Sequence, residues 1–208
     1  MMMQQLVQSL PDIGLTYQEY LEEVGRFAGL DPACAATDTE RERCAVGPLN
    51  LQRMTRIGKT FTPSAETVEL MRGITSPQRW MVISEPWCGD SAQSIPIIAR
   101  IAELSPAVEL RCVLRDRHPG VMDLFLTSGA RSIPKLVAFS PEGEILFQWG
   151  PRPAGGMAVV AEAKAEGVSK QVREERLHRW FAGDRGAQIE KELCACITRQ
   201  RPAADVPA

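Results

Sequence analysis

The segment 87–91, Trp-Cys-Gly-Asp-Ser, places a thiol, a carboxylate and a hydroxyl within one turn of chain. It lies between the apolar run 80–83, which is typical of a buried strand, and the helical apolar pattern of residues 91–104. A thiol in the first turn of a helix faces unpaired amides and the positive end of the helix dipole, which favour the thiolate. The thiolate attacks disulfides and is the form that peroxides oxidise. Cys88 is therefore the candidate nucleophile.

A mixed sheet with helices on its faces is needed to present this turn. After the first strand, the sequence predicts a strand over 108–114 and a hairpin of 136–139 with 145–147. Pro119 is expected to open a helix between them, with Leu124 on its apolar face. The order strand, helix, strand, helix, strand, strand predicts an α/β fold.

Residues 1–77 are predicted to form an N-terminal helical extension. Thr16 and Glu19 have the spacing of a capping box, which marks the start of a helix. A second helix is expected over 49–57, and a third is expected to begin near Pro63.

The core is predicted to span residues 78–152, and residues 153–200 are predicted to form a C-terminal helical segment. Ser169 and Asp184 are its expected N-caps. Residues 201–208 contain two prolines and are expected to form a frayed tail.

The composition excludes several classes of function. The net charge is −2, which indicates neither nucleic-acid binding nor attraction to an anionic membrane. No signal peptide and no membrane span are expected, which favours a cytoplasmic location with the six cysteines reduced. Two histidines and scattered cysteines predict no metal site. No cofactor is expected, and the oligomeric state stays open.

The segment 87–91 resembles the Trp-Cys-Gly-Pro-Cys active site of thioredoxins, and further landmarks follow in order. Pro96 matches the proline that kinks the active-site helix of that family, and 116–119 resembles its Asp-x-x-Pro. The run 128–134, Ser-Gly-Ala-Arg-Ser-Ile-Pro, resembles Tyr-Gly-Ile-Arg-Gly-Ile-Pro, and Gly143 falls at the expected hairpin tip. The resemblance covers about a third of the chain and implies a thioredoxin-like fold with helical extensions at both ends.

In thioredoxins the proline that ends this run is cis and faces the nucleophile, and the residue before it offers its backbone to an extended substrate. The resemblance therefore implies a catalytic Cys88 supported by Ser91. It also implies that five residues contact the substrate: Trp87, Gly89, Asp90, Ile133 and Pro134.

Three positions depart from the thioredoxin pattern. Ser91 replaces the resolving cysteine, so it cannot break a mixed disulfide, although it can donate a hydrogen bond to the thiolate or cap the helix. Asp90 replaces the motif proline; it is another candidate N-cap, and its negative charge opposes a thiolate. Val82 stands where the family has a buried acid that moves protons. These losses count against a two-cysteine reductase.

Further sequence features bear on the chemistry of the motif and its surroundings. Cys-Gly-Asp-Ser is similar to the Cys-Gly-Phe-Ser of monothiol glutaredoxins, but their Gly-Gly-x-x-Asp glutathione element is not evident, so an iron–sulfur cluster is not expected. Cys112 is predicted to be buried in the second core strand. The turn 149–153 is expected to cap the core rather than bind a ligand. Three arginines would make the rim of the site basic, although solvated loop charges are the commoner case: Arg115, Arg117 and Arg131.

Two functions fit these observations. The leading hypothesis is a redox protein of monothiol type, in which Cys88 exchanges with a protein disulfide or with the mixed disulfide of a low-molecular-weight thiol. The alternative is a non-catalytic binding module whose helical extensions form the partner surface. A Cys88→Ser variant separates the two hypotheses, because only the first needs the thiol.

Overall fold

The computed structural model describes residues 2–200. Its elements follow in chain order: α1 (Met2–Ile13), α2 (Tyr17–Ala28), η1 (Pro32–Cys34), α3 (Asp38–Thr60), α4 (Ala65–Arg72), β1 (Gln78–Ser84), α5 (Gly89–Ala102), β2 (Val108–Leu114), α6 (Pro119–Met122), β3 (Lys135–Phe139), β4 (Ile145–Trp149), α7 (Ala154–Ala165), α8 (Lys170–Asp184) and α9 (Ala187–Thr198). The tail predicted over 201–208 lies outside the described residues.

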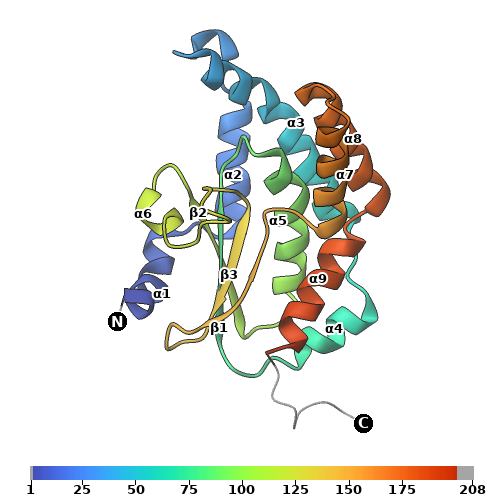
Figure 1. The fold of residues 1–208 in the computed structure, drawn as a ribbon. Helices are drawn as coiled ribbons and strands as arrows, with labels where there is room; N and C mark the ends of the chain where they lie inside the picture. Colours follow the sequence, from blue (N-terminus) through green and yellow to red (C-terminus); the bar gives the residue numbers. More distant parts are fainter. Residues whose placement is uncertain (1, 201–208) are drawn as a thin grey trace.

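The four strands form one mixed sheet in the order β2-β1-β3-β4, with β1 parallel to β2 and the other pairs antiparallel. Successive residues of β1 face opposite sides of the sheet. Trp80 and Val82 pack with α5, α9 and the N-terminal helices α2 and α3, whereas Met81 and Ile83 pack with α1 and α6. Helices therefore cover both faces (Figure 1), which confirms the predicted α/β architecture.

Helix boundaries differ from the sequence predictions at several places. The capping box of Thr16 is confirmed, but α3 begins far before residue 49, because Thr37 and Glu40 form a second capping box that the sequence analysis missed. The helix expected to begin near Pro63, α4, begins two residues later, at Ala65, with Ser64 as its N-cap. The helix α1 was not predicted; its side chains cover the second face of the sheet.

The C-terminal helices and α6 also refine the predictions. Ser169 caps α8 as expected. Asp184 is the last residue of α8 instead of an N-cap, yet its carboxylate accepts hydrogen bonds from the amides of Gly186 and Gln188 at the start of α9. The helix α6 ends at Met122, so Leu124 lies outside it and is 38% exposed instead of packing on a helix face.

None of the helices within residues 2–200 combines the length and the apolar character needed to cross a membrane.

Helix α9 holds the chain segment that leaves β4. The Glu192 carboxylate accepts hydrogen bonds from Trp149 Nε1 and from the Ala154 amide, each at 2.7 Å. One side chain thus fixes both ends of residues 149–154 and satisfies a free amide at the start of α7.

We expect Glu192→Ala to lower the free energy of unfolding by about 2 kcal/mol, because two donors lose a charged acceptor. Urea denaturation followed by circular dichroism measures this. Lys191→Ala, at the exposed neighbouring position, is the control and should leave the stability nearly unchanged. Equal stability of the two variants would show that Glu192 does not hold this segment.

Candidate functional site

Cys88 lies at the N-terminus of α5, directly after β1. It occupies the N-cap position, and its carbonyl accepts the first helical hydrogen bond, from Ala92 at 3.0 Å. The helix begins at Gly89, so the two candidate N-caps from the sequence, Asp90 and Ser91, lie inside the helix. The thiol is nevertheless in the first-turn environment that the sequence predicted.

The Cys88 sulfur is nearly enclosed. Its residue is 8% exposed, and Sγ donates a hydrogen bond to the Ile133 carbonyl at 3.4 Å. Burial raises the pKa of Cys88, the Asp90 carboxylate raises it further, and hydrogen bonding by the hydroxyl and amide of Ser91 opposes both. The expected preference for thiolate at a helix N-terminus is therefore outweighed by desolvation. Asp90 acts in the predicted direction.

Ser91 lies behind the sulfur rather than on the protein surface. It is 1% exposed, and its hydroxyl has no fully formed hydrogen bond among the described residues. The hydroxyl is close enough to lower the pKa of Cys88. The structure thus places Ser91 where a donor to the thiolate is needed.

Asp90 pairs with Arg152, a residue that the sequence analysis did not select. Asp90 Oδ2 lies 2.6 Å from Arg152 Nη2, and burial raises the pKa of Asp90. Trp149 caps the core as predicted, but the same segment also brings Arg152 back to the motif. Gly150 has φ +108°, and a Cβ there would lie 2.3 Å from the Pro134 carbonyl oxygen, so glycine is required for this path.

His178 reaches the motif from α8. Its Cε1 lies 3.3 Å from the position that a Cβ on Gly89 would take, and its Nδ1 lies 3.4 Å from Gln93 Nε2. Burial, with help from Arg53 and Arg152, lowers the pKa of His178 to about 4, so the imidazole is neutral near pH 7. A single histidine in a helical pattern gave no signal in the sequence.

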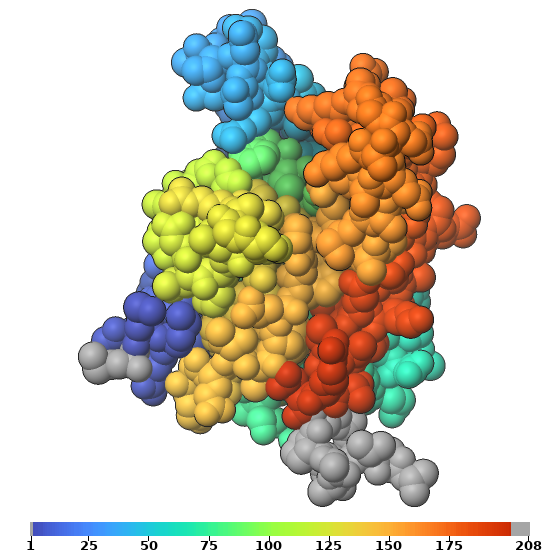
Figure 2. Space-filling view, viewed as in Figure 1, coloured from blue at the N-terminus to red at the C-terminus, as the bar shows by residue number. Residues whose placement is uncertain are grey.

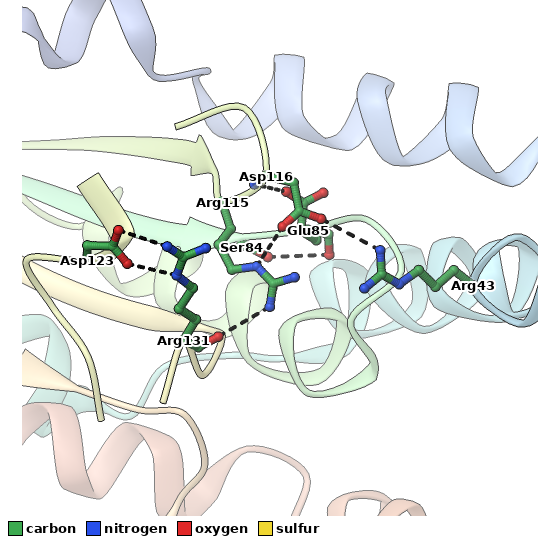
Figure 3. A network of polar contacts seen from close by, with 7 residues as sticks. All are labelled: Arg43, Ser84, Glu85, Arg115, Asp116, Asp123 and Arg131. Carbon is green, nitrogen blue, oxygen red and sulfur yellow. Dashed lines mark hydrogen bonds and ion pairs between the residues drawn. The ribbon is translucent and has the colours of Figure 1, made fainter. Parts of the chain in front are cut away.

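Trp87 is fixed between two guanidinium groups. The Arg43 and Arg115 guanidinium carbons lie 4.0 Å and 4.9 Å from the ring centroid. Asp116 lies between the same arginines, 2.8 Å from Arg115 Nε and 3.7 Å from Arg43 Nη1 (Figure 3). The indole is therefore a rigid wall of the site.

The rim arginines do not supply free positive charge. Arg115 is paired with Asp116, Arg117 with Glu23, and Arg131 with both oxygens of Asp123 at 2.7 and 2.8 Å. Arg115 also donates to the Arg131 carbonyl, which ties the motif side of the site to the loop before Pro134 (Figure 3). Each arginine of the expected rim is thus engaged in an ion pair, although Asp116 is shared with Arg43 and Glu23 with Arg26.

A groove of about 560 Å³ opens over the sulfur. Its floor contains four predicted site residues, namely Trp87, Cys88, Gly89 and Asp90, and its walls come from α3 and α8. Figure 2 shows the green surface near the start of α5. It lies between the blue surface around the start of α3 and the orange surface of α7 and α8. Ile133 and Pro134, joined by a cis peptide bond, are buried on the other side of the thiol and do not line this groove.

No disulfide joins the cysteines of the described structure. All six cysteines are free, and Cys112 is fully buried in β2, as predicted, with its pKa raised to about 12 by burial. Within residues 2–200 no three His, Cys, Asp or Glu side chains gather in a way that could hold a metal ion. Val82 is buried in the core, and the buried carboxylate nearest in sequence to Cys88 is Asp90.

Two solved structures are similar to this chain in fold. The crystal structure of an HIV epitope scaffold superposes with a TM-score of 0.62 at 16% identity, over 92% of this chain and 97% of that one. A protein of unknown function from Pseudomonas aeruginosa gives a TM-score of 0.59 at 18% identity, over 92% and 96% of the two chains. These likenesses show the fold, helical extensions included. No curated protein matches significantly.

A family model described as thioredoxin matches residues 42–164, from within α3 to the end of α7. The match covers more than half of the 208 residues and includes the sheet, the Cys88 turn and Arg152. By this match and by its fold, the chain belongs to the thioredoxin family.

Proposed function

We propose that the protein carries out thiol–disulfide exchange through a single cysteine, Cys88. The observation that supports this most directly is the position of the Cys88 sulfur at the floor of a groove, beside the Asp90–Arg152 ion pair. A core packing role would not require a groove, an ion pair and a helix N-terminus at the same sulfur.

The exchange has two steps without net oxidation. The Cys88 sulfur attacks one sulfur of a disulfide R–S–S–R′; the S–S bond breaks, and R′ leaves as a thiolate. The product is a mixed disulfide between Cys88 and R. An external thiol R″–SH then attacks the sulfur of R, which releases Cys88 and forms R–S–S–R″. The external thiol is needed because Ser91 cannot act as a resolving cysteine.

Asp90 is the proposed proton acceptor of the first step. Burial raises the pKa of the Asp90 carboxyl, which makes it a better proton acceptor than an ordinary carboxylate. When Asp90 takes the thiol proton on its unpartnered Oδ1, its negative charge no longer opposes the thiolate. Arg152 then faces the sulfur anion, and the departing R′ thiolate removes the proton.

The other predicted residues support this cycle. Ser91 and the first amides of α5 stabilise the thiolate, and Trp87 forms the wall along which the substrate enters. Ile133 accepts the thiol hydrogen bond in the resting state through its carbonyl. The substrate is a protein disulfide or a small-thiol mixed disulfide, and a reducing compartment such as the cytoplasm supplies the releasing thiol.

A non-catalytic binding module is the second candidate. It is favoured by the 8% exposure of Cys88 and by the raised pKa of its thiol, since both make a sulfur less reactive. In that case the groove between α3 and α8 would bind a partner without covalent chemistry.

Cys88→Ser should reduce exchange to the rate of the protein-free solution. The assay follows release of a fluorescent peptide from its disulfide in the presence of glutathione, with adducts mapped by peptide mass spectrometry. Cys34→Ser, which removes an exposed cysteine, is the control and should keep the full rate. Exchange that persists in Cys88→Ser would leave the binding module as the better description.

Asp90→Asn should lower the pKa of Cys88, because the carboxylate that raises it becomes neutral while Arg152 stays cationic. Iodoacetamide labelling of Cys88, measured against pH, should then shift to lower pH and proceed faster at pH 7. In the unmodified protein, half-maximal labelling should fall above the ordinary thiol pKa. Glu69→Gln, on the exposed surface of α4, should change nothing. An unchanged or upward shift in Asp90→Asn contradicts the proposed role of Asp90.

A further inference from the structure

Among the cationic side chains that line the groove over Cys88, one has no carboxylate of the described residues within ion-pair distance. These cationic side chains are Arg43, Arg53, Arg152 and Lys170. Arg152 is paired with Asp90, Lys170 lies within 3.8–3.9 Å of two glutamates, and Arg43 is paired with Asp116. Among residues 2–200, no carboxylate lies within ion-pair distance of Arg53.

Arg53 points at the reactive turn. Its Nη1 lies 3.7 Å from the position that a Cβ on Gly89 would take, and 3.2 Å from Asn50 Oδ1. Burial and then the neighbouring Arg56 lower the pKa of Arg53, while the more distant carboxylates of Glu174 and Asp90 raise it, so this half-buried charge is only partly compensated. Such a charge costs free energy in the folded protein, and an anion bound beside it offsets that cost.

The polar network of the groove floor is also incomplete. Asp90 Oδ1 and Arg152 Nε are buried and have no hydrogen-bond partner among the described residues, and the Asp90 side chain is only 10% exposed. Buried polar atoms in folded proteins nearly always have partners. Both atoms lie below the surface of the groove, so they leave its floor polar beside the sulfur without contacting a molecule bound there.

The shape of the groove favours a small molecule over a protein chain. About 560 Å³ is within the range of small-molecule sites. Ile133, the backbone that an extended peptide would pair with, is 7% exposed, and its carbonyl already accepts the Cys88 thiol. A peptide strand would have to displace that contact, whereas a small thiol reaches the sulfur from the groove.

On the basis of the exchange function proposed above, we propose that the disulfide partner of Cys88 is a low-molecular-weight thiol that carries a carboxylate, and that Arg53 binds this carboxylate. His178 lies against the same turn, but its imidazole is neutral. The positive charge of Arg53 is therefore the feature that favours a carboxylate-bearing thiol over a neutral one. The S–S bond that forms joins Cys88 to the small thiol, as in the cycle above.

The test uses three symmetrical disulfides of similar size: those of 3-mercaptopropionic acid (anionic), 2-mercaptoethanol (neutral) and cysteamine (cationic). Mixed-disulfide formation at Cys88 is followed by peptide mass spectrometry, and each rate is divided by the rate of the same disulfide with a free cysteine peptide. We expect the anionic probe to react about tenfold faster than the neutral one on this scale.

Arg53→Gln should remove most of that preference, and Arg53→Lys should keep part of it. Lys59→Gln is the control on the same helix, because Lys59 lines a different cavity and should leave the preference intact. A carboxylate preference that is absent, or that survives in Arg53→Gln, overturns the inference while leaving exchange at Cys88 in place.

A second measurement does not depend on exchange. The unreactive thioether 3-(methylthio)propionate is titrated while the His178 imidazole signal is followed by nuclear magnetic resonance, with its neutral amide as the control ligand. Only two histidines are present, so a His118→Gln variant assigns the signals. The acid alone should shift the His178 signal, and Arg53→Gln should abolish the shift. If no disulfide reacts but the Arg53-dependent shift is seen, the exchange proposal is wrong and the carboxylate site is supported. If the shift is absent as well, both proposals are wrong.

Discussion

The enclosure of the Cys88 sulfur is the constraint on which the rest of the site depends. A sulfur at the end of a strand and the start of a helix would ordinarily be acidic, because the helix amides favour its anion. Here α3 and α8 limit the access of water to the sulfur, and the cost of desolvating its anion outweighs the effect of the helix amides. Every charged group nearby then matters more, since water does not screen it. Asp90 gains its influence on the thiol from that enclosure.

The site is assembled from three parts of the chain that contribute different things. The turn after β1 provides the sulfur and the floor, the segment after β4 provides a cation, and the two extensions provide walls with further polar groups. The apolar cluster that contains Trp80 also contains side chains of α2, α3, α8 and α9. The extensions are thus built into the same core as the sheet, and the groove is as rigid as that core.

The sequence predicted what depends on local pattern. The strands, the turn at Cys88 and the capped start of α2 follow from apolar periodicity and from hydrogen bonds a few residues apart. The helix α1 was missed because it carries an internal proline and no charged caps. Arg53, Arg152 and His178 were missed for another reason. Each lies in an ordinary local pattern, and only the packing of distant elements brings them to Cys88, so no spacing rule could select them.

Glu192 accepts hydrogen bonds from both ends of residues 149–154, and this segment therefore connects α9 with the surroundings of Cys88. The cation beside the sulfur, Arg152, is carried by the very segment that docks α9. Whatever strengthens or loosens that docking also changes how firmly Arg152 is held near Cys88. Where the charge of the sulfur affects how firmly Arg152 is held, thermodynamic reciprocity requires the docking of α9 to change by the same free energy. One short stretch of chain, residues 149–154, therefore connects the surroundings of Cys88 with the C-terminal helix.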